Sequence, residues 1–159
     1  MADVNAGQNL ADPLRFLREE ELRAGAEQLL FAARDIGADG EVELTSLGLG
    51  HAHGRLLALI ARRGPLTVYE ALRLLRITKQ SLNRVTQDLA TRGLIAIEPD
   101  RSDRRRRQIR LTDEGRALEQ RLWRERAVRI AAAFREAGPE AVAGFRRVLA
   151  ALAAVRRPR

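Results

Sequence analysis

Seven polar side chains between positions 78 and 87 could hydrogen-bond to the bases or phosphates of a nucleic acid. They are Thr78, Lys79, Gln80, Ser81, Asn83, Arg84 and Gln87. Arginine can donate two hydrogen bonds to guanine, and asparagine or glutamine can pair with adenine. Leu82, Val85 and Leu89 recur among them at helical spacing, which predicts a helix with one apolar face. We expect the polar set on the opposite face, where it could read the major groove of DNA.

A dense basic segment follows this helix, in which Asp103 precedes Arg104, Arg105, Arg106 and Arg107. Four adjacent arginines repel one another, which disfavours a purely structural turn. The strongly negative potential of a narrow minor groove attracts arginine side chains. Asp103 can orient one guanidinium through a bidentate ion pair. The segment is therefore predicted to contact DNA beside the helix.

Two short helices joined by a tight turn would position the polar face. Thr67 and Glu70 have the spacing of a capping box, which opens a helix that ends near Leu75. Thr78 can cap the next helix, and Gly93 is suited to end it. This arrangement is a helix-turn-helix. Strand-like runs at residues 94–98 and 108–111 enclose the arginine-rich segment, and such a hairpin after a helix-turn-helix makes a winged helix.

Further helices flank the winged helix. The predicted fold class is mainly α with a small antiparallel β-hairpin. Residues 1–12 are expected to be a disordered tail and residues 38–50 a loop with one helical turn near Leu44–Leu47. The remaining predicted elements are helices over 13–37, 51–63 and 113–155, the last broken at Gly138-Pro139.

The composition excludes several classes of protein. The chain has 159 residues, a formal net charge of +8 and no cysteine, which excludes disulfides and Cys-ligated zinc. Residues 1–60 carry a net charge of −5 and residues 61–159 carry +13, which favours a separate surface for a polyanion. Aromatic residues make up 4% of the chain, too few for a base-stacking platform. No apolar run approaches the ~20 residues that span a bilayer. Residues 1–10 also lack the regions of a signal peptide, so a cytoplasmic protein without a membrane partner is expected.

Two other functions are alternatives to DNA reading. An enzyme is disfavoured because the sequence has no catalytic constellation, no glycine-rich phosphate loop and no metal cluster. His51 and His53 alone make a poor metal or haem site, so no metal and no cofactor is expected. The second alternative is an architectural or RNA-binding protein that uses its positive charge without sequence preference.

The sequence resembles the MarR family of bacterial transcription regulators. The resemblance is carried by residues 64–67, 77–84 and 92–95, and most specifically by Asp100-Arg101-Ser102-Asp103-Arg104-Arg105 with Ile109-Arg110-Leu111-Thr112-Asp113-Glu114-Gly115. Arg101 stands where a proline is common in the family. The resemblance implies that Arg105 is the tip of the wing, that Asp103 is its ion-pair partner, and that Arg104, Arg106 and Arg107 serve phosphates.

The resemblance also implies an obligate homodimer. Residues 13–37 and 113–155 would form the helical dimerisation region and residues 51–112 the winged helix-turn-helix domain. These flanking helices carry more apolar surface than one winged helix can cover, which favours an isologous interface. Two recognition helices roughly 34–36 Å apart would then meet a pseudo-palindromic operator, with repression as the expected effect. The alternative is a monomer whose flanking helices pack on the wing domain.

Members of the family commonly bind a small aromatic anion that releases the DNA. The residues near the elements that flank the family's pocket are His51, His53, Arg55, Tyr69 and Trp123. Each is more often a packing or solvated residue than a ligand contact, and the sequence identifies no effector.

Overall fold

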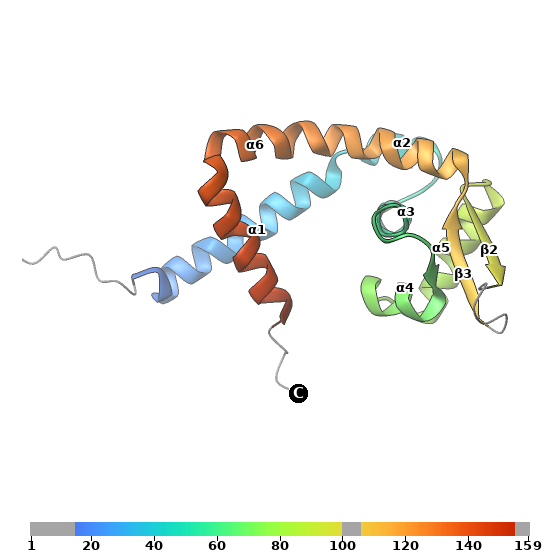
Figure 1. Ribbon diagram of the computed structural model, residues 1–159, viewed down its shortest axis with the longest axis horizontal. Coiled ribbons are helices and arrows are strands. Elements are labelled where there is room, and N and C mark those ends of the chain that lie inside the picture. Colours follow the sequence, from blue (N-terminus) through green and yellow to red (C-terminus); the bar gives the residue numbers. More distant parts are fainter. Residues whose placement is uncertain (1–14, 100–105, 155–159) are drawn as a thin grey trace, which may run out of the picture. The chain divides into compact units, whose positions relative to one another are not determined.

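The computed structural model describes residues 15–99 and 106–154 and divides the chain into two units, Met1–Ala38 and Asp39–Arg159 (Figure 1). The described part of the first unit is a 3₁₀ turn, Arg15–Leu17, and helix α1, Glu19–Ala38. Three glutamates, Glu19–Glu21, open α1, where the partial positive charge of a helix terminus favours acids. No residue of α1 is buried.

The predicted ends of this first helix differ from those observed. Pro13 lies outside the described residues, and regular helix begins only at Glu19. Gly37, the predicted stop, lies inside α1. The left-handed conformation that allows the chain to turn occurs at Gly40 instead, with φ of 84°.

The second unit begins with helix α2, Glu41–Ser46, where the sequence predicted a loop with a single helical turn. The reason is tertiary, because Leu44 is only 1% exposed and joins the core. Helix α3, His51–Arg63, has the predicted bounds and ends at Gly64, whose φ is 83°.

The helix-turn-helix follows as predicted. Helix α4 spans Val68–Leu75 and helix α5 spans Lys79–Thr91. The capping box of α4 is confirmed: the Glu70 N–H donates to the Thr67 hydroxyl at 3.2 Å, and the Thr67 N–H donates to the Glu70 carboxylate at 2.8 Å. The hydrogen bonds from the Thr67 backbone and hydroxyl, with Arg73 and Arg106 nearby, hold the pKa of Glu70 below its ordinary value.

The sheet contains one more strand than predicted. Strands β2, Ile95–Pro99, and β3, Arg107–Leu111, form the expected antiparallel hairpin, in which Ile97 lies opposite Ile109. Strand β1, Leu66–Thr67, pairs with the other edge of β3, giving the order β1-β3-β2. Two residues are too few for an alternating pattern, so no sequence signal marks β1. The predicted fold class, mainly α with a small antiparallel β-hairpin, is confirmed, and β1 extends the hairpin to three strands.

Helix α3 occupies the centre of the second unit and is seen end-on between α4 and α6 in Figure 1. Leu56 and Leu57 of α3 are fully buried among side chains from α5, β3 and α6. Helix α6, Asp113–Ala154, contains the predicted break, because Gly138 has non-helical φ and ψ of 78° and 167°. Phe145, which follows the break, packs its ring edge-on against the ring of Phe134, with the two ring centroids 6.2 Å apart.

The start of α6 lies against the backbone that follows α5. The Thr112 hydroxyl accepts the Gly115 N–H at 3.0 Å and donates to the Gly93 carbonyl at 2.6 Å. A Cβ atom added to Gly115 would lie 1.9 Å from the Leu94 carbonyl oxygen. Only glycine allows α6 to approach the wing this closely.

Replacing Gly115 by alanine should therefore destabilise the protein strongly. We expect the free energy of unfolding to fall by about 2–4 kcal/mol, because the backbone of Leu94 must move away. Gly144→Ala is the matched control on the same helix, since its nearest neighbour is a flexible Arg147 nitrogen at 3.9 Å. Urea titrations followed by circular dichroism would measure both variants, and equal stability of the two would contradict the close approach.

Candidate nucleic-acid interface

Helix α5 has one buried and one exposed face. Leu82 is 1% exposed, Leu89 is fully buried, and Val85 lies between them in the core. All seven polar residues predicted to contact DNA are exposed: Thr78, Lys79, Gln80, Ser81, Asn83, Arg84 and Gln87. The predicted separation of the two faces is confirmed.

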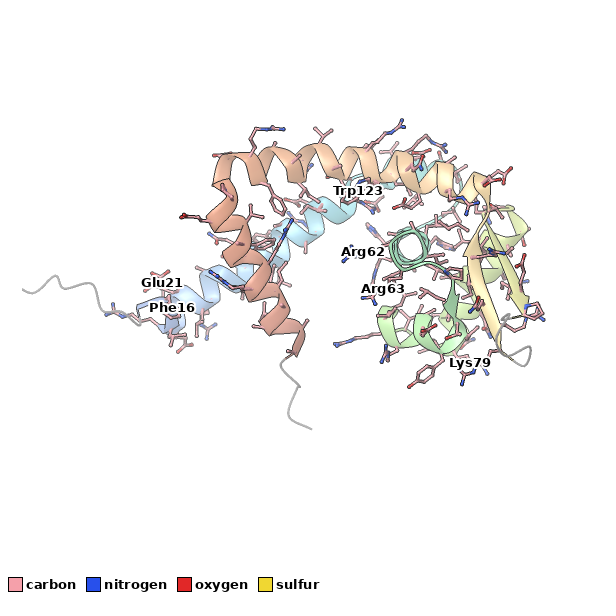
Figure 2. The ribbon with its side chains drawn as sticks, in the orientation of Figure 1. Phe16, Glu21, Arg62, Arg63, Lys79 and Trp123 are labelled. Atoms are coloured by element: carbon pink, nitrogen blue, oxygen red, sulfur yellow. The ribbon has the colours of Figure 1, made fainter. Side chains whose placement is uncertain are left out.

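Two of the seven residues also form the N-terminal cap of α5. The Thr78 hydroxyl accepts the Ser81 N–H at 3.1 Å and donates to the Ser81 hydroxyl at 2.9 Å. These bonds fix the first turn of the helix. Lys79 begins that turn, and Figure 2 shows it at the edge of the winged helix opposite the edge where Trp123 lies on α6.

The base of the wing carries exposed arginines on β3 and just before it. Arg106 and Arg107 are both exposed, and the Arg107 guanidinium donates to the Ile97 carbonyl of β2 at 3.4 Å. Across the same hairpin, Arg110 forms an ion pair with Glu98 at 2.9 Å. Asp103, Arg104 and Arg105, the predicted tip and its neighbours, lie outside the described residues.

A groove of about 620 Å³ runs between the start of α4 and the base of the wing. It is lined by Thr67, Val68, Tyr69, Glu70, Arg73, Arg106 and Arg107. Its three guanidinium groups outnumber the single carboxylate of Glu70, so the groove adds positive charge beside the wing. The sequence alone did not single out Arg73, although it lies one helical turn after Tyr69 and therefore on the same side of α4.

The five residues predicted near an effector pocket have separate surroundings. His51 lies 3.3 Å from Glu41 of α2, and Arg55 donates to the Leu75 carbonyl at 3.3 Å. Trp123 is 51% exposed on α6. Tyr69 is 73% exposed and lines the groove beside the wing, which contains none of the other four.

The fifth residue, His53, is mostly buried and bonds to Asp88 of α5 at 3.2 Å. Within residues 15–99 and 106–154, no three side chains of the His, Asp or Glu type are grouped so that they could hold a metal ion. None of the helices in these ranges is long and apolar enough to cross a membrane.

The sequence and the fold are similar to those of known transcription regulators. The family model described as "MarR family" matches residues 47–106. The HTH-type transcriptional regulator PetP of Rhodobacter capsulatus is 43% identical over 152 residues, which cover 96% of this chain and 90% of PetP. PetP is a regulator of transcription.

Solved structures agree with this assignment at the level of the fold. A MarR family transcriptional regulator from Silicibacter pomeroyi superposes with a TM-score of 0.72 at 24% identity, covering 88% of this chain and 93% of that one. NadR in complex with 4-hydroxyphenylacetate superposes with a TM-score of 0.67 at 22% identity, covering 98% of this chain and 100% of NadR. On the strength of the PetP match and the winged helix described above, the chain belongs to the MarR family of transcriptional regulators.

Proposed function

We propose that this regulator binds a specific pseudo-palindromic DNA operator as a homodimer in the cytoplasm and represses transcription. The observation that carries the proposal is the division of α5 into a fully buried apolar stripe and an exposed face of seven hydrogen-bonding side chains. A helix held in this way presents its N-terminal polar residues to the major groove. The proposed reading surface consists of Thr78, Lys79, Gln80, Ser81, Asn83, Arg84 and Gln87.

The wing supplies the second part of the proposed interface. Arg106 and Arg107 are exposed at the base of the hairpin, beside the basic groove. Asp103, Arg104 and Arg105 are proposed to continue this surface, with Arg105 entering the minor groove and Asp103 orienting it. The remaining arginines would contact phosphates, which contribute affinity without reading sequence.

The proposed homodimer rests on apolar surface that the chain itself does not cover. In α1, Leu30 is 68% exposed and Phe31 is 50% exposed, and no residue of the helix is buried. Beyond the break in α6, Val148 and Leu152 are 58% and 55% exposed. Monomeric proteins rarely expose contiguous apolar surface of this kind. Helices with such faces are typical of a dimer interface, and they weigh against the monomer alternative.

An effector of the aromatic carboxylate class is proposed by analogy with NadR, which binds 4-hydroxyphenylacetate. Such a ligand would release the operator only if it binds more tightly to the DNA-free state than to the DNA-bound state. His51, His53, Arg55 and Trp123 remain the proposed neighbours of the effector. Tyr69 is better assigned to the basic groove beside the wing, with Arg106 and Arg107.

Sequence-specific binding is tested by enrichment of duplexes from a random library with the full-length protein. We expect the enriched duplex to contain two inverted half-sites and to bind at least ~10³-fold more tightly than random duplex at the same salt concentration. Fluorescence anisotropy would measure both dissociation constants. A ratio near one would favour the alternative of a non-specific architectural protein.

Two substitutions should distinguish the recognition of bases from the binding of phosphates. Asn83→Ala should change which base is preferred at one position of each half-site, because Asn83 is exposed on the proposed reading face. Arg106→Ala should weaken binding to all duplexes alike. It should also make the slope of log K against log salt shallower by about one unit, because one phosphate contact is lost. Arg124→Ala, an exposed arginine of α6, is the charge-matched control. Unchanged base preference in Asn83→Ala would contradict the assigned face of α5.

The dimer should dissociate when charge is placed on α1. We expect Leu30→Asp to shift the protein toward monomer in analytical ultracentrifugation, because a buried unpaired carboxylate is unfavourable in an apolar interface. Val42→Asp is the control, since Val42 is 86% exposed in α2, outside the proposed dimerisation helices. A monomeric wild-type protein, or a Leu30→Asp variant that dimerises like the wild type, would contradict the proposal.

A further inference from the structure

A ring of hydrogen bonds joins the turn between α2 and α3 to the C-terminal half of α5. The Arg92 side chain donates from Nε to the Leu47 carbonyl and from Nη1 to the Asp88 carbonyl, each at 3.0 Å. The Asp88 carboxylate lies 3.2 Å from Nε2 of His53, and Nδ1 of His53 accepts the Gly50 N–H at 3.0 Å. We call these five residues the α5 latch.

The two ring nitrogens of His53 have defined roles in the latch. Because Nδ1 accepts a hydrogen bond from a backbone N–H, it carries no proton. The proton of the neutral imidazole is therefore on Nε2, which donates to the carboxylate of Asp88. Only 14% of the His53 side chain is exposed, so water competes little for this bond. A neutral imidazole thus satisfies both partners at once.

The latch contacts α5 at the boundary between the exposed face and the buried stripe, where Asp88 follows Arg84 of the exposed face by one helical turn. Asp88 and Arg92 are four residues apart and therefore lie on the same side of the helix. Asp88 stands between Gln87 of the exposed face and Leu89 of the buried stripe. A bond at this flank opposes rotation of α5 about its own axis.

The apolar stripe alone does not oppose such a rotation well. Burial of Leu82, Val85 and Leu89 holds α5 on the core, but the hydrophobic effect is not directional. Hydrogen bonds weaken steeply when their angles change. The rotation of α5 decides which base edges Asn83 and Gln87 can reach, because each pairing with a base requires a particular geometry.

We propose that His53 and Asp88, supported by Arg92, are positioning residues that set the rotation of α5 and thereby the sequence specificity of the protein. This inference rests on the proposed function, in which α5 reads DNA. The inference also implies that a movement of the turn between α2 and α3 is transmitted to α5. Leu47 and Gly50 belong to that turn and bond directly to Arg92 and His53.

The residue at position 53 can either keep or open the latch. A glutamine at the third position of a helix reaches back to the backbone N–H of the cap residue. His53→Gln should keep both bonds, because its amide oxygen can accept the Gly50 N–H and its amide nitrogen can donate to Asp88. His53→Leu should lose the bond to Asp88, because leucine has no donor, and Asp88→Ala removes the same bond from the other side. His53→Gln is therefore the matched control for His53→Leu.

The experiment uses the duplex that the full-length wild-type protein enriches from a random library, together with a random duplex. We expect His53→Leu and Asp88→Ala each to bind the enriched duplex about tenfold more weakly, a change of ~1.4 kcal/mol, and His53→Gln to bind it like the wild type. Binding to random duplex should stay as in the wild type, because the phosphate contacts are retained. The double variant should lose no more than either single variant, since both remove one bond.

Several results would overturn the latch. Affinity for the enriched duplex that stays at the wild-type value in both variants would do so, and so would an equal loss on both duplexes, which indicates a general structural defect. The same loss in His53→Gln would also count against it. If the wild-type protein enriches no duplex, the proposed function fails, and this outcome is distinct from a failure of the latch alone.

Discussion

The burial of one face of α5 is the constraint on which the rest of the interface depends. Thirteen residues are too few for a helix of this composition to be stable alone in water. Packing of Leu82 and Leu89 into the core is worth roughly 1.5–3 kcal/mol for each side chain. The opposite orientation would bury arginine, asparagine and glutamine without partners, which is strongly unfavourable. The apolar stripe therefore determines which side chains meet DNA, before any contact with DNA is made.

Hydrogen bonds hold α5 at its two ends, in addition to the apolar packing along its buried face. At the turn between α4 and α5, Arg76 adopts a left-handed conformation with φ of 53°, which is unfavourable for a residue with a side chain. Its N–H closes α4 on the Leu72 carbonyl at 2.9 Å, and Arg55 of α3 donates to the neighbouring Leu75 carbonyl. The turn is thus held from both α4 and α3. With the Thr78 cap on one side and the latch on the other, α5 is fixed at each end by polar bonds and in the middle by the core.

Local sequence patterns predicted the elements that depend on local interactions. The capping box of Thr67 and Glu70, the cap at Thr78 and the two faces of α5 follow from spacing within a few residues, and all are observed. Strand β1 was missed because a long-range contact stabilises it: Leu66 pairs with Ile109, more than forty positions away in the sequence. Helix α2 was predicted only as a single turn, because its buried residue Leu44 joins a core built from distant parts of the chain.

The same distinction applies to the candidate site. The exposed residues of α5 could be identified from the sequence, because helical periodicity alone places them. The bond between His53 and Asp88 spans 35 positions and joins two helices, so no local pattern indicates it. The sequence singled out His53 as a residue near the elements that flank the family's pocket, and its partner Asp88 could be named only from the folded structure.

The distribution of charge would give α1 a role beyond the proposed dimerisation. A polyanion attracts every basic surface, so a protein that is basic throughout would bind DNA in many orientations. Here the first sixty residues are net acidic, and α1 begins with three glutamates, while the positive charge is concentrated in the later part of the chain. The acidic segment is repelled by phosphates, whereas the groove at Arg73, Arg106 and Arg107 is attracted. With α5 as the proposed reading helix, this contrast in charge would favour approach of the groove to the duplex, and the rotation of α5 would decide which sequence it can read.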